Sequence, residues 1–364
     1  MSLTKKILLF DAIPLVACLT SLWMMHAHQS DKVHIPFKAN PESVVVSSLD
    51  EARPEEAAAM LEPEPEPEAT KKGNRPKRKL SSSVFHPGRP DTVPYMAFDP
   101  MMLQAMYEQA NYLRRRDTPA RGASGISKTD MLRTVELLQS VQLLDPNVLL
   151  TTFDFYSINT DLKKDKVRVT GYYTPLIKAS RVQSAEFSFP MLARPESGVP
   201  NPAAIEAGAL AGKGLELAWL PSKKELRNAQ LQGSCLIEFT DGKREHFGFG
   251  GSVKGAGGTY VFFKEVDEQV LGAGYFPLTA GYSVAVDTRY IPIGSTLLAE
   301  LPDIDAAGKL KGYTYRIIFA QDRGGAIKTT KRIDLYCGMG QKGLQEARKV
   351  NRFGRLWLLL PKEK

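Results

Sequence analysis

The feature that most constrains the fold is a succession of short β-rich segments that begins near residue 166 and continues to the end of the chain. Glycine, proline and aspartate separate these segments at irregular distances, a pattern typical of β-barrels and sandwiches rather than of βαβ units. The predicted strands are Val167–Tyr173, Cys235–Phe239, Tyr260–Phe263, Ser283–Val286, Tyr313–Phe319, Arg332–Tyr336 and Arg355–Leu360. We therefore expect a mainly β fold class.

Two helices are predicted before the strands, and both have the character of structural elements. Asp99 and Pro100 supply an N-cap and a first-turn proline, and apolar residues follow at helical spacing as far as Leu113. Ser127 and Asp130 form a capping-box-like pair at the start of the second helix. A last helix is predicted near residues 341–350.

The N-terminus has the order of an export signal, because Lys5 and Lys6 precede an apolar run over residues 7–25. Within the run, Leu15-Val16-Ala17-Cys18 resembles a bacterial lipobox, which predicts lipidation of Cys18. The run stays apolar beyond Cys18, so an uncleaved membrane anchor is the alternative. Both interpretations hold the chain on a membrane of the cell envelope, as an outer-membrane lipoprotein or an anchored protein, with the rest facing the periplasm.

A formal net charge of +8, from 48 basic and 40 acidic residues, acquires a meaning once the charges are located. Residues 62–68 alternate glutamate and proline, a pattern that favours an extended chain. A basic cluster follows: Lys71, Lys72, Arg75, Lys77, Arg78 and Lys79. We interpret residues 28–95 as a disordered, solvated linker, with contact to an anionic lipid or wall surface as the alternative. Nucleic acid is not an expected partner outside the cytoplasm.

Few residues suit metal or nucleophile chemistry. Four of the five histidines precede the region that we expect to fold, which leaves His246 without the partners that a zinc site or a Ser-His-Asp site needs. Cys18, Cys235 and Cys337 show no CxxC spacing. We expect no metal and no cofactor, so the chemistry must depend on carboxylates, hydroxyls or lysine.

The glycine-dense stretch over residues 248–258 does not match a phosphate-binding loop. The residue before Lys254 is valine, and no helical pattern follows. We interpret this stretch as a flexible loop.

Three aspartates stand in similar settings late in the chain. Asp287 and Asp322 each end a predicted strand, and a Gly-Gly pair soon after Asp322 permits close approach of a ligand. Asp334 lies within a strand, where period-two alternation puts it on one face with Arg332 and Tyr336. Taken singly, each aspartate could instead accept backbone N–H groups in a turn.

Six motifs together identify a family resemblance over about residues 100–360. They are Thr170–Pro175, Gln232-Gly233-Ser234, Val261-Phe262-Phe263, Asp322–Lys328, Ile333–Tyr336 and Gly354–Trp357. With these motifs the chain resembles the MltA family of membrane-bound lytic murein transglycosylases. The C-terminal part looks like the 3D domain of that family, which is named for three aspartates that Asp287, Asp322 and Asp334 match.

The resemblance implies a double-psi β-barrel with N-terminal helices, into which a second, smaller β-barrel domain is inserted, and a glycan-binding groove between the two. The expected boundaries are an export signal or anchor over residues 1–27, a linker over 28–95, the first part of the barrel over 96–174, the inserted domain over 175–264 and the second part, the 3D domain, over 265–364.

The resemblance also implies cleavage of the β-1,4 bond between N-acetylmuramic acid and N-acetylglucosamine of peptidoglycan, with formation of a 1,6-anhydro end. The catalytic acid of the family maps to Asp334. The substrate-binding positions map to Gly171, Tyr172, Tyr173, Thr174, Gln232, Ser234, Asp287, Asp322, Gly324, Gly325 and Ala326. One carboxyl suffices when the 6-hydroxyl of the sugar is the nucleophile, whereas hydrolytic glycosidases generally use two.

Two alternatives remain open. One is a non-catalytic peptidoglycan-binding barrel protein, because the chain is shorter than the family pattern between Phe247 and Tyr260. The other is an inverting glycoside hydrolase that uses Asp334 and Asp322. If Cys235 and Cys337 both flank the groove, they are candidates for a disulfide.

Overall fold

The computed structural model describes residues 78–363 except residues 94, 142–143, 163–164, 268 and 306. All of these belong to one compact unit, Asn74–Lys364. The predicted export signal, the lipidation of Cys18 and most of the predicted linker lie outside the described residues. Within this part of the chain, no helix is long and apolar enough to cross a membrane.

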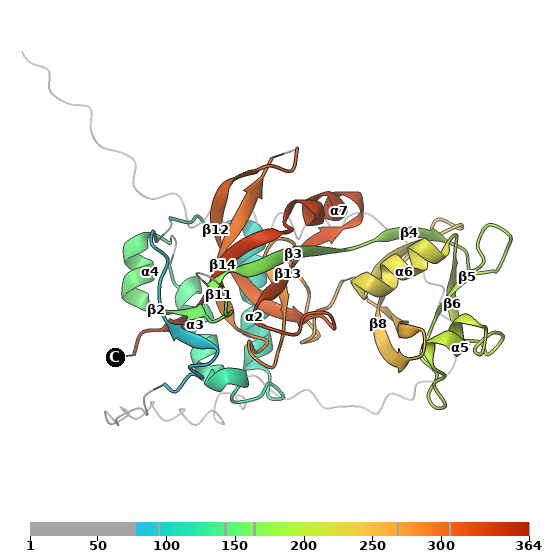
Figure 1. The fold of residues 1–364 in the computed structure, drawn as a ribbon, viewed down its shortest axis with the longest axis horizontal. Coiled ribbons are helices and arrows are strands. Elements are labelled where there is room, and N and C mark those ends of the chain that lie inside the picture. The colour runs from blue at the N-terminus through green and yellow to red at the C-terminus, as the bar shows by residue number, and fades with distance from the viewer. Residues whose placement is uncertain are drawn as a thin grey trace, which may run out of the picture. The chain divides into compact units, whose positions relative to one another are not determined.

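Six strands close into a ring in the order β14, β11, β12, β10, β13, β3 and back to β14. Figure 1 labels all of these strands except β10. β10 is parallel to β12 and β3 is parallel to β13, while the other four pairings are antiparallel. The mainly β fold class and the double-psi barrel are confirmed. The strands are β3 (Val167–Thr174), β10 (Ser283–Val286), β11 (Thr296–Ile304), β12 (Leu310–Arg323), β13 (Arg332–Met339) and β14 (Arg352–Pro361).

Two further strands extend this sheet beyond β14. β2 (Phe153–Ile158) pairs with β14, and β1 (Phe85–Pro87) pairs with β2. Val84 and Phe85 are buried in the core of the barrel. The prediction of a disordered linker is therefore wrong for its last part, because residues from 78 onward pack on the folded domain. No strand was predicted here because Val84 and Phe85 are only two apolar residues between turn residues, too few to show strand periodicity.

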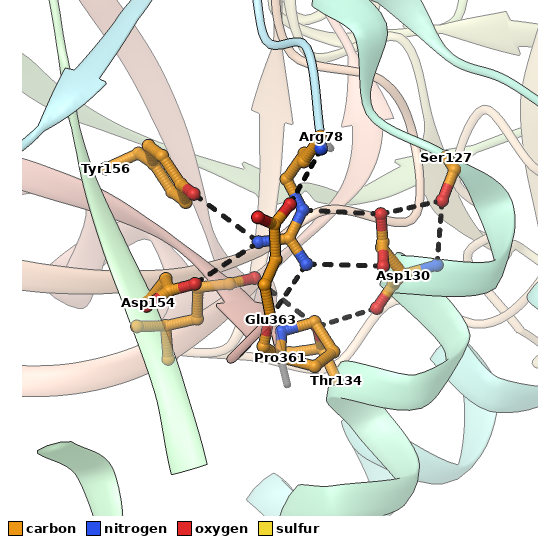
Figure 2. Close-up of polar contacts among 9 residues, drawn as sticks. Arg78, Ser127, Asp130, Thr134, Asp154, Tyr156, Pro361 and Glu363 are labelled. Carbon is orange, nitrogen blue, oxygen red and sulfur yellow. Dashed lines mark hydrogen bonds and ion pairs between the residues drawn. The ribbon is translucent and has the colours of Figure 1, made fainter. Parts of the chain in front are cut away.

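The prediction of a solvated basic cluster is wrong for Arg78, because its side chain is only 8% exposed. The guanidinium donates hydrogen bonds to both carboxylate oxygens of Asp130 and, at 2.8 Å, to the carbonyl oxygen of Pro361 (Figure 2). It also lies 3.5 Å from a carboxylate oxygen of Asp154 and donates to the Tyr156 hydroxyl. One side chain thus ties the start of the folded unit to a helix, to β2 and to the end of β14.

Helices occur where the capping signals predicted them. α2 (Pro100–Arg114) begins after Asp99, whose carboxylate accepts the N–H of Met102. α3 (Lys128–Gln139) begins after Ser127, whose hydroxyl accepts the N–H of Asp130. Leu113 and Met131 of these helices are buried in the barrel core. α7 (Gly340–Lys349) follows β13 directly, and a short helix that was not predicted, α4 (Pro146–Thr152), precedes β2.

The chain between β3 and β10 forms two small sheets with hydrophobic cores of their own. One sheet has the order β4 (Leu176–Ala179), β7 (Cys235–Phe239), β8 (Arg244–Gly255) and β9 (Gly258–Val266). The other pairs β5 (Phe189–Leu192) with β6 (Glu216–Leu220), and the helices are α5 (Pro202–Glu206) and α6 (Lys223–Gln232). These residues do not contribute to the core of the barrel.

The predicted glycine-rich flexible loop is wrong, because β8 and β9 form one long hairpin through it. The register shifts between Phe249 and Gly251, where β8 carries a bulge. A Cβ atom on Gly250 would lie 2.5 Å from the backbone of Phe263, so this position requires glycine. Glycines that serve a bulge and a turn obscured the alternation of a strand.

Candidate active site

Asp322, Ala285, Asp334 and Thr170 occupy one row across four neighbouring strands, β12, β10, β13 and β3. Side chains that lie directly opposite each other on paired strands share a face of the sheet. The two aspartates therefore flank one alanine, and the strand spacing puts their Cα atoms about 10 Å apart. The barrel thus gathers two of the three predicted aspartates at one place.

Asp334 is partly buried and is surrounded by donors. Arg332 donates from Nε to Oδ1 at 2.8 Å and from Nη2 to Oδ2 at 2.9 Å. The hydroxyl of Thr170 also donates to Oδ1, and Arg332 Nε lies 3.0 Å from this hydroxyl. Arg332 and Asp334 share a face, as the strand period predicted. A carboxyl that accepts from a guanidinium at both oxygens has the hydrogen-bond pattern of an ionised carboxylate.

Asp322 has different surroundings. The hydroxyl of Tyr172 donates to Oδ2 and the backbone N–H of Arg323 donates to Oδ1, both at 2.8 Å. Burial raises the pKa of Asp322 to about 6, although these hydrogen bonds act in the opposite direction. Burial and the neighbouring Asp322 raise the pKa of Tyr172 well above its ordinary value, so the phenol stays a donor. The site therefore contains an ion-paired carboxyl, Asp334, and a second carboxyl, Asp322, whose pKa is raised above that of an ordinary aspartate.

A set of hydroxyl groups continues from the two aspartates toward β7. The rings of Tyr172 and Tyr336 pack together with their centroids 5.3 Å apart. The hydroxyl of Tyr336 lies 3.1 Å from Thr174 Oγ1, which lies 3.3 Å from Ser234 Oγ. The predicted residues Tyr172, Thr174 and Ser234 are thus connected through Tyr336.

Tyr173 and Gln232, both predicted to bind substrate, bind each other. Gln232 ends α6, and its Oε1 accepts the backbone N–H of Tyr173 at 3.1 Å. Asn228 donates to the Tyr173 hydroxyl at 3.0 Å, and the Tyr173 side chain is buried. Gly233 adopts the left-handed conformation that ends the helix. These contacts fasten α6 to β3.

Two other predicted substrate-binding residues have structural partners. Arg289 donates from Nη2 to the buried Asp287 at 2.6 Å and also from its backbone N–H, and these bonds hold the pKa of Asp287 below its usual range. A Cβ atom on Gly171 would lie 2.6 Å from the Cα of Ala347 in α7. Asp287 therefore orders its own turn, and Gly171 lets α7 pack closely on β3.

The loop after Asp322 is accessible. A Cβ atom on Gly325 would meet nothing within 4 Å, and Ala326 is exposed. Ile327 anchors the loop, because its side chain is buried and its N–H donates to the carbonyl oxygen of Gly324. A ligand can therefore approach the backbone beside Asp322.

The suggested disulfide is absent, because Cys235 and Cys337 are both free and buried. Cys235 lies 3.7 Å from the sulfur of Met191 in a core of the inserted sheets, and Cys337 lies in the barrel core. Burial raises the pKa of each thiol to about 12. Spacing in the sequence did not reveal that the two thiols belong to different cores.

Thr170 is a site residue that the sequence did not single out. Its signals were its place at the start of the motif Thr170–Pro175 and its position two residues before Tyr172, on the same face of β3. Its contact with Asp334 depends on the register of β3 and β13. Within the described residues, no three His, Cys, Asp or Glu side chains come together as a metal site would require.

The chain matches two family models. Residues 168–261 match the MltA specific insert domain, and residues 282–360 match the 3D domain. Membrane-bound lytic murein transglycosylase A of Escherichia coli (strain K12) is 33% identical over 240 residues, which are 53% of this chain and 65% of that protein. The protein of the same name from Vibrio cholerae is 29% identical over 244 residues, 54% of this chain and 66% of that protein. The chain thus spans somewhat less than two thirds of the length of these relatives.

Solved structures show the same architecture. The crystal structure of E. coli MltA with bound chitohexaose superposes with a TM-score of 0.65 and 26% identity, covering 80% of this chain and 98% of that chain. The membrane-bound lytic murein transglycosylase of Agrobacterium tumefaciens superposes with a TM-score of 0.60 and 21% identity, covering 71% of this chain and 92% of that chain. The second likeness concerns the fold alone.

Proposed function

We propose that this chain, which belongs to the MltA family and carries its insert domain and 3D domain, is a lytic transglycosylase that cleaves the glycan strands of peptidoglycan. The relatives are named lytic murein transglycosylases, and one solved relative binds an oligosaccharide. The observation that carries the proposal is the row in which Asp334, with Arg332 and Thr170 on its oxygens, lies two strands from Asp322.

In the proposed reaction, Asp334 donates a proton to the oxygen of the β-1,4 bond between N-acetylmuramic acid and N-acetylglucosamine. The 6-hydroxyl of the muramic acid then attacks its own C1, and the Asp334 carboxylate accepts the proton of that hydroxyl. The product carries a 1,6-anhydro ring, no water is consumed, and Asp334 ends in the protonated state in which it began. One carboxyl can perform both steps because the substrate supplies the nucleophile.

The surroundings of Asp334 supply groups that suit a sugar. Tyr172 and Ser234 are partly exposed, and they rest on Tyr336 and Thr174, which are buried. We propose that Tyr172 and Ser234, positioned by Tyr336 and Thr174, bind the sugars next to the bond that is cleaved, together with Asp322 and the accessible loop at Gly324, Gly325 and Ala326. Gly171, Tyr173, Gln232 and Asp287 support this site through the packing and hydrogen bonds described above.

An inverting hydrolase is the second candidate, and the position of Asp322 favours it. The two carboxyls of an inverting enzyme lie about 6.5–9.5 Å apart. Asp322 and Asp334 lie on the two strands that flank β10, and carboxyls placed in this way can meet that separation. The raised pKa of Asp322, about 6, also suits an acid that is protonated near neutral pH. The two candidates differ in their products.

Mass spectrometry of the muropeptides released from purified sacculi tests both candidates. A lytic transglycosylase releases anhydro ends, a hydrolase releases reducing ends, and a binding protein releases neither. We expect Asp334→Asn to reduce the release of anhydro ends by at least about a hundredfold, with an unchanged circular dichroism spectrum and unchanged co-sedimentation with sacculi.

The matched control is Asp303→Asn, which removes an exposed aspartate of β11 in the same barrel. It should release anhydro ends at the wild-type rate. Turnover close to wild type by Asp334→Asn would overturn the assignment of the acid. Reducing ends from the wild-type chain would favour the hydrolase.

We also propose that the chain is held on a membrane of the cell envelope with its barrel facing the periplasm. The relatives are named membrane-bound, and the sequence around Cys18 resembles a lipobox. Metabolic labelling with a fatty acid should mark the wild-type chain and not Cys18→Ser. If Cys18→Ser remains in the membrane fraction and the wild type takes up no label, the N-terminus is an uncleaved anchor.

A further inference from the structure

We infer that Arg332 binds a carboxylate of the peptide that the glycan strand carries, and that this contact releases Asp334 to act as an acid. The inference rests on the proposed function and adds a residue that determines which strands the site prefers. It makes Arg332 both the partner that occupies Asp334 in the free protein and the recognition group for substrate.

The first observation is that both carboxylate oxygens of Asp334 already accept hydrogen bonds from protein side chains in this structure. Arg332 donates to both of its carboxylate oxygens, and Thr170 donates to one of them. A general acid carries a proton on one oxygen and directs it at the leaving group, and a neutral carboxyl offers a guanidinium no charge and fewer acceptor sites. Proton transfer to the substrate therefore needs one of these two oxygens to turn from Arg332 toward the leaving group.

The second observation concerns the charge that remains when this contact opens. Arg332 makes no ion pair except that with Asp334 among the described residues. A guanidinium that loses its counter-ion in a partly buried place is unfavourable unless another anion takes over. The side chain of Arg332 is 36% exposed and that of Asp334 is 16% exposed, so Arg332 is the partner that can reach an incoming ligand.

The third observation is a second cation beside the first. Arg168 of β3 lies directly opposite Arg332 in the parallel pairing, and its guanidinium donates to the neutral side chain of Asn351. Like charges directly opposite each other in a sheet repel. Arg332 has the carboxylate of Asp334 as its counter-ion, whereas Arg168 makes no ion pair among the described residues, so this position attracts an anion.

The chemistry of the proposed substrate identifies the anion. The sugars of a peptidoglycan strand are acylated and neutral, whereas the peptides attached to muramic acid end in free carboxylates. The planar fork of a guanidinium matches a carboxylate with two hydrogen bonds. A strand whose peptides keep their free carboxylates can replace Asp334 at Arg332, and a strand whose carboxylates have been converted to amides cannot.

Every proton that Asp334 takes up in this cycle is also given up. The substrate carboxylate binds Arg332, and Asp334 takes a proton from solvent. Asp334 gives this proton to the glycosidic oxygen and receives the proton of the 6-hydroxyl. When the product leaves with its carboxylate, Asp334 returns that proton to solvent and binds Arg332 again.

The test compares uncrosslinked glycan strands that carry peptides with the same strands after their carboxylates have been converted to amides with a carbodiimide and ammonia. Removal of the peptides by an amidase would instead leave a lactyl carboxylate on each muramic acid. With the full wild-type chain we expect kcat/KM to be at least about tenfold higher on the strands with free carboxylates. Arg332→Gln should lower kcat/KM on these strands and raise kcat on the amidated strands, because no guanidinium then holds both oxygens of Asp334. The preference should fall to about twofold or less, and Arg332→Lys should retain part of it.

Lys331→Gln is the matched control. It removes the same charge one residue away, on the opposite face of the chain, where Lys331 pairs with Asp161 at 3.5 Å. The control should keep the wild-type preference. No preference in the wild-type chain, or the same preference in Arg332→Gln and Lys331→Gln, would overturn the inference while leaving the proposed function in place.

Calorimetry with the free stem tetrapeptide tests the contact without catalysis. The wild-type chain should bind this peptide at least about tenfold more tightly than Arg332→Gln does, and a peptide whose carboxylates are amidated should bind equally weakly to both. Equal affinity of the two chains for the free tetrapeptide would overturn the inference even if no anhydro ends were ever released.

Discussion

The hydroxyl of Tyr172 donates a hydrogen bond to the carboxyl of Asp322 and thereby joins β3 to β12, which lie opposite each other in the ring of six strands. Asp334, in the same row as Asp322, is instead bound by Arg332. One carboxyl has a neutral phenol and a raised pKa of about 6, and the other has a cation. Environments that differ in this way allow two carboxyls to perform different tasks.

Asp322→Asn should change how stability depends on pH. The pKa of an unfolded aspartate is about 4, and that of Asp322 in the folded chain is raised to about 6. The folded state thus holds this proton more tightly, so Asp322 lowers the free energy of unfolding progressively as pH rises from about 4 to about 6. Relative to wild type, Asp322→Asn should become more stable over this interval by up to about 3 kcal/mol, as measured by urea unfolding at several pH values.

Tyr172→Phe is the companion variant. Its hydroxyl favours the charged form of Asp322, so its removal should raise the pKa of Asp322 further. The pH interval over which wild-type stability falls should then extend upward. A stability difference between Asp322→Asn and wild type that is constant from pH 4 to pH 7 would show that the proton of Asp322 is not held as described.

Arg78→Ala should destabilise the folded unit by about 1–3 kcal/mol. It leaves Asp130 and the carbonyl oxygen of Pro361 without the guanidinium that now binds both (Figure 2). Arg114→Ala breaks a solvent-exposed ion pair with Glu136 on the neighbouring helices and should change stability by less than about 0.5 kcal/mol. Equal effects of the two variants in thermal unfolding would contradict an anchoring role for Arg78.

Gly171→Ala should destabilise the folded unit, whereas Gly325→Ala should not. The new methyl at Gly171 would meet Ala347 at 2.6 Å, so α7 must shift, at a cost of about 1–3 kcal/mol in stability. The new methyl at Gly325 meets nothing within 4 Å, so stability should stay within about 0.5 kcal/mol of wild type. Denaturant unfolding measures both, and a destabilised Gly325→Ala would argue against an open loop.

Cys235 and Cys337 should react with a thiol reagent only when the chain unfolds. Both are buried, and burial raises their pKa values to about 12, so almost no thiolate is present at neutral pH. Peptide mapping after alkylation under native and denaturing conditions, without reductant, measures this. A peptide that contains both cysteines joined would contradict the structure.

Strands with a compact apolar pattern could be predicted from the sequence. β7 and β10 have the predicted bounds, and the cores of β3, β12, β13 and β14 lie where their patterns indicated. β11 was missed because Pro302 and Asp303 break its apolar run, and β8 was missed because its glycines resemble a loop. The core of β9, its hairpin partner, was predicted as Tyr260–Phe263. Local residue preferences do not report whether a distant strand will satisfy the backbone of such a segment.

The sequence by itself determined the mainly β fold class, the helix starts at Asp99 and Ser127, and the common face of Arg332 and Asp334, because caps and strand periodicity are local properties of the chain. Only the tertiary structure decided that Ala285 separates Asp322 from Asp334, that Thr170 binds Asp334, and that Arg78 belongs to the folded unit. These contacts join residues far apart in sequence, and they depend on the register with which the strands of the closed ring pair.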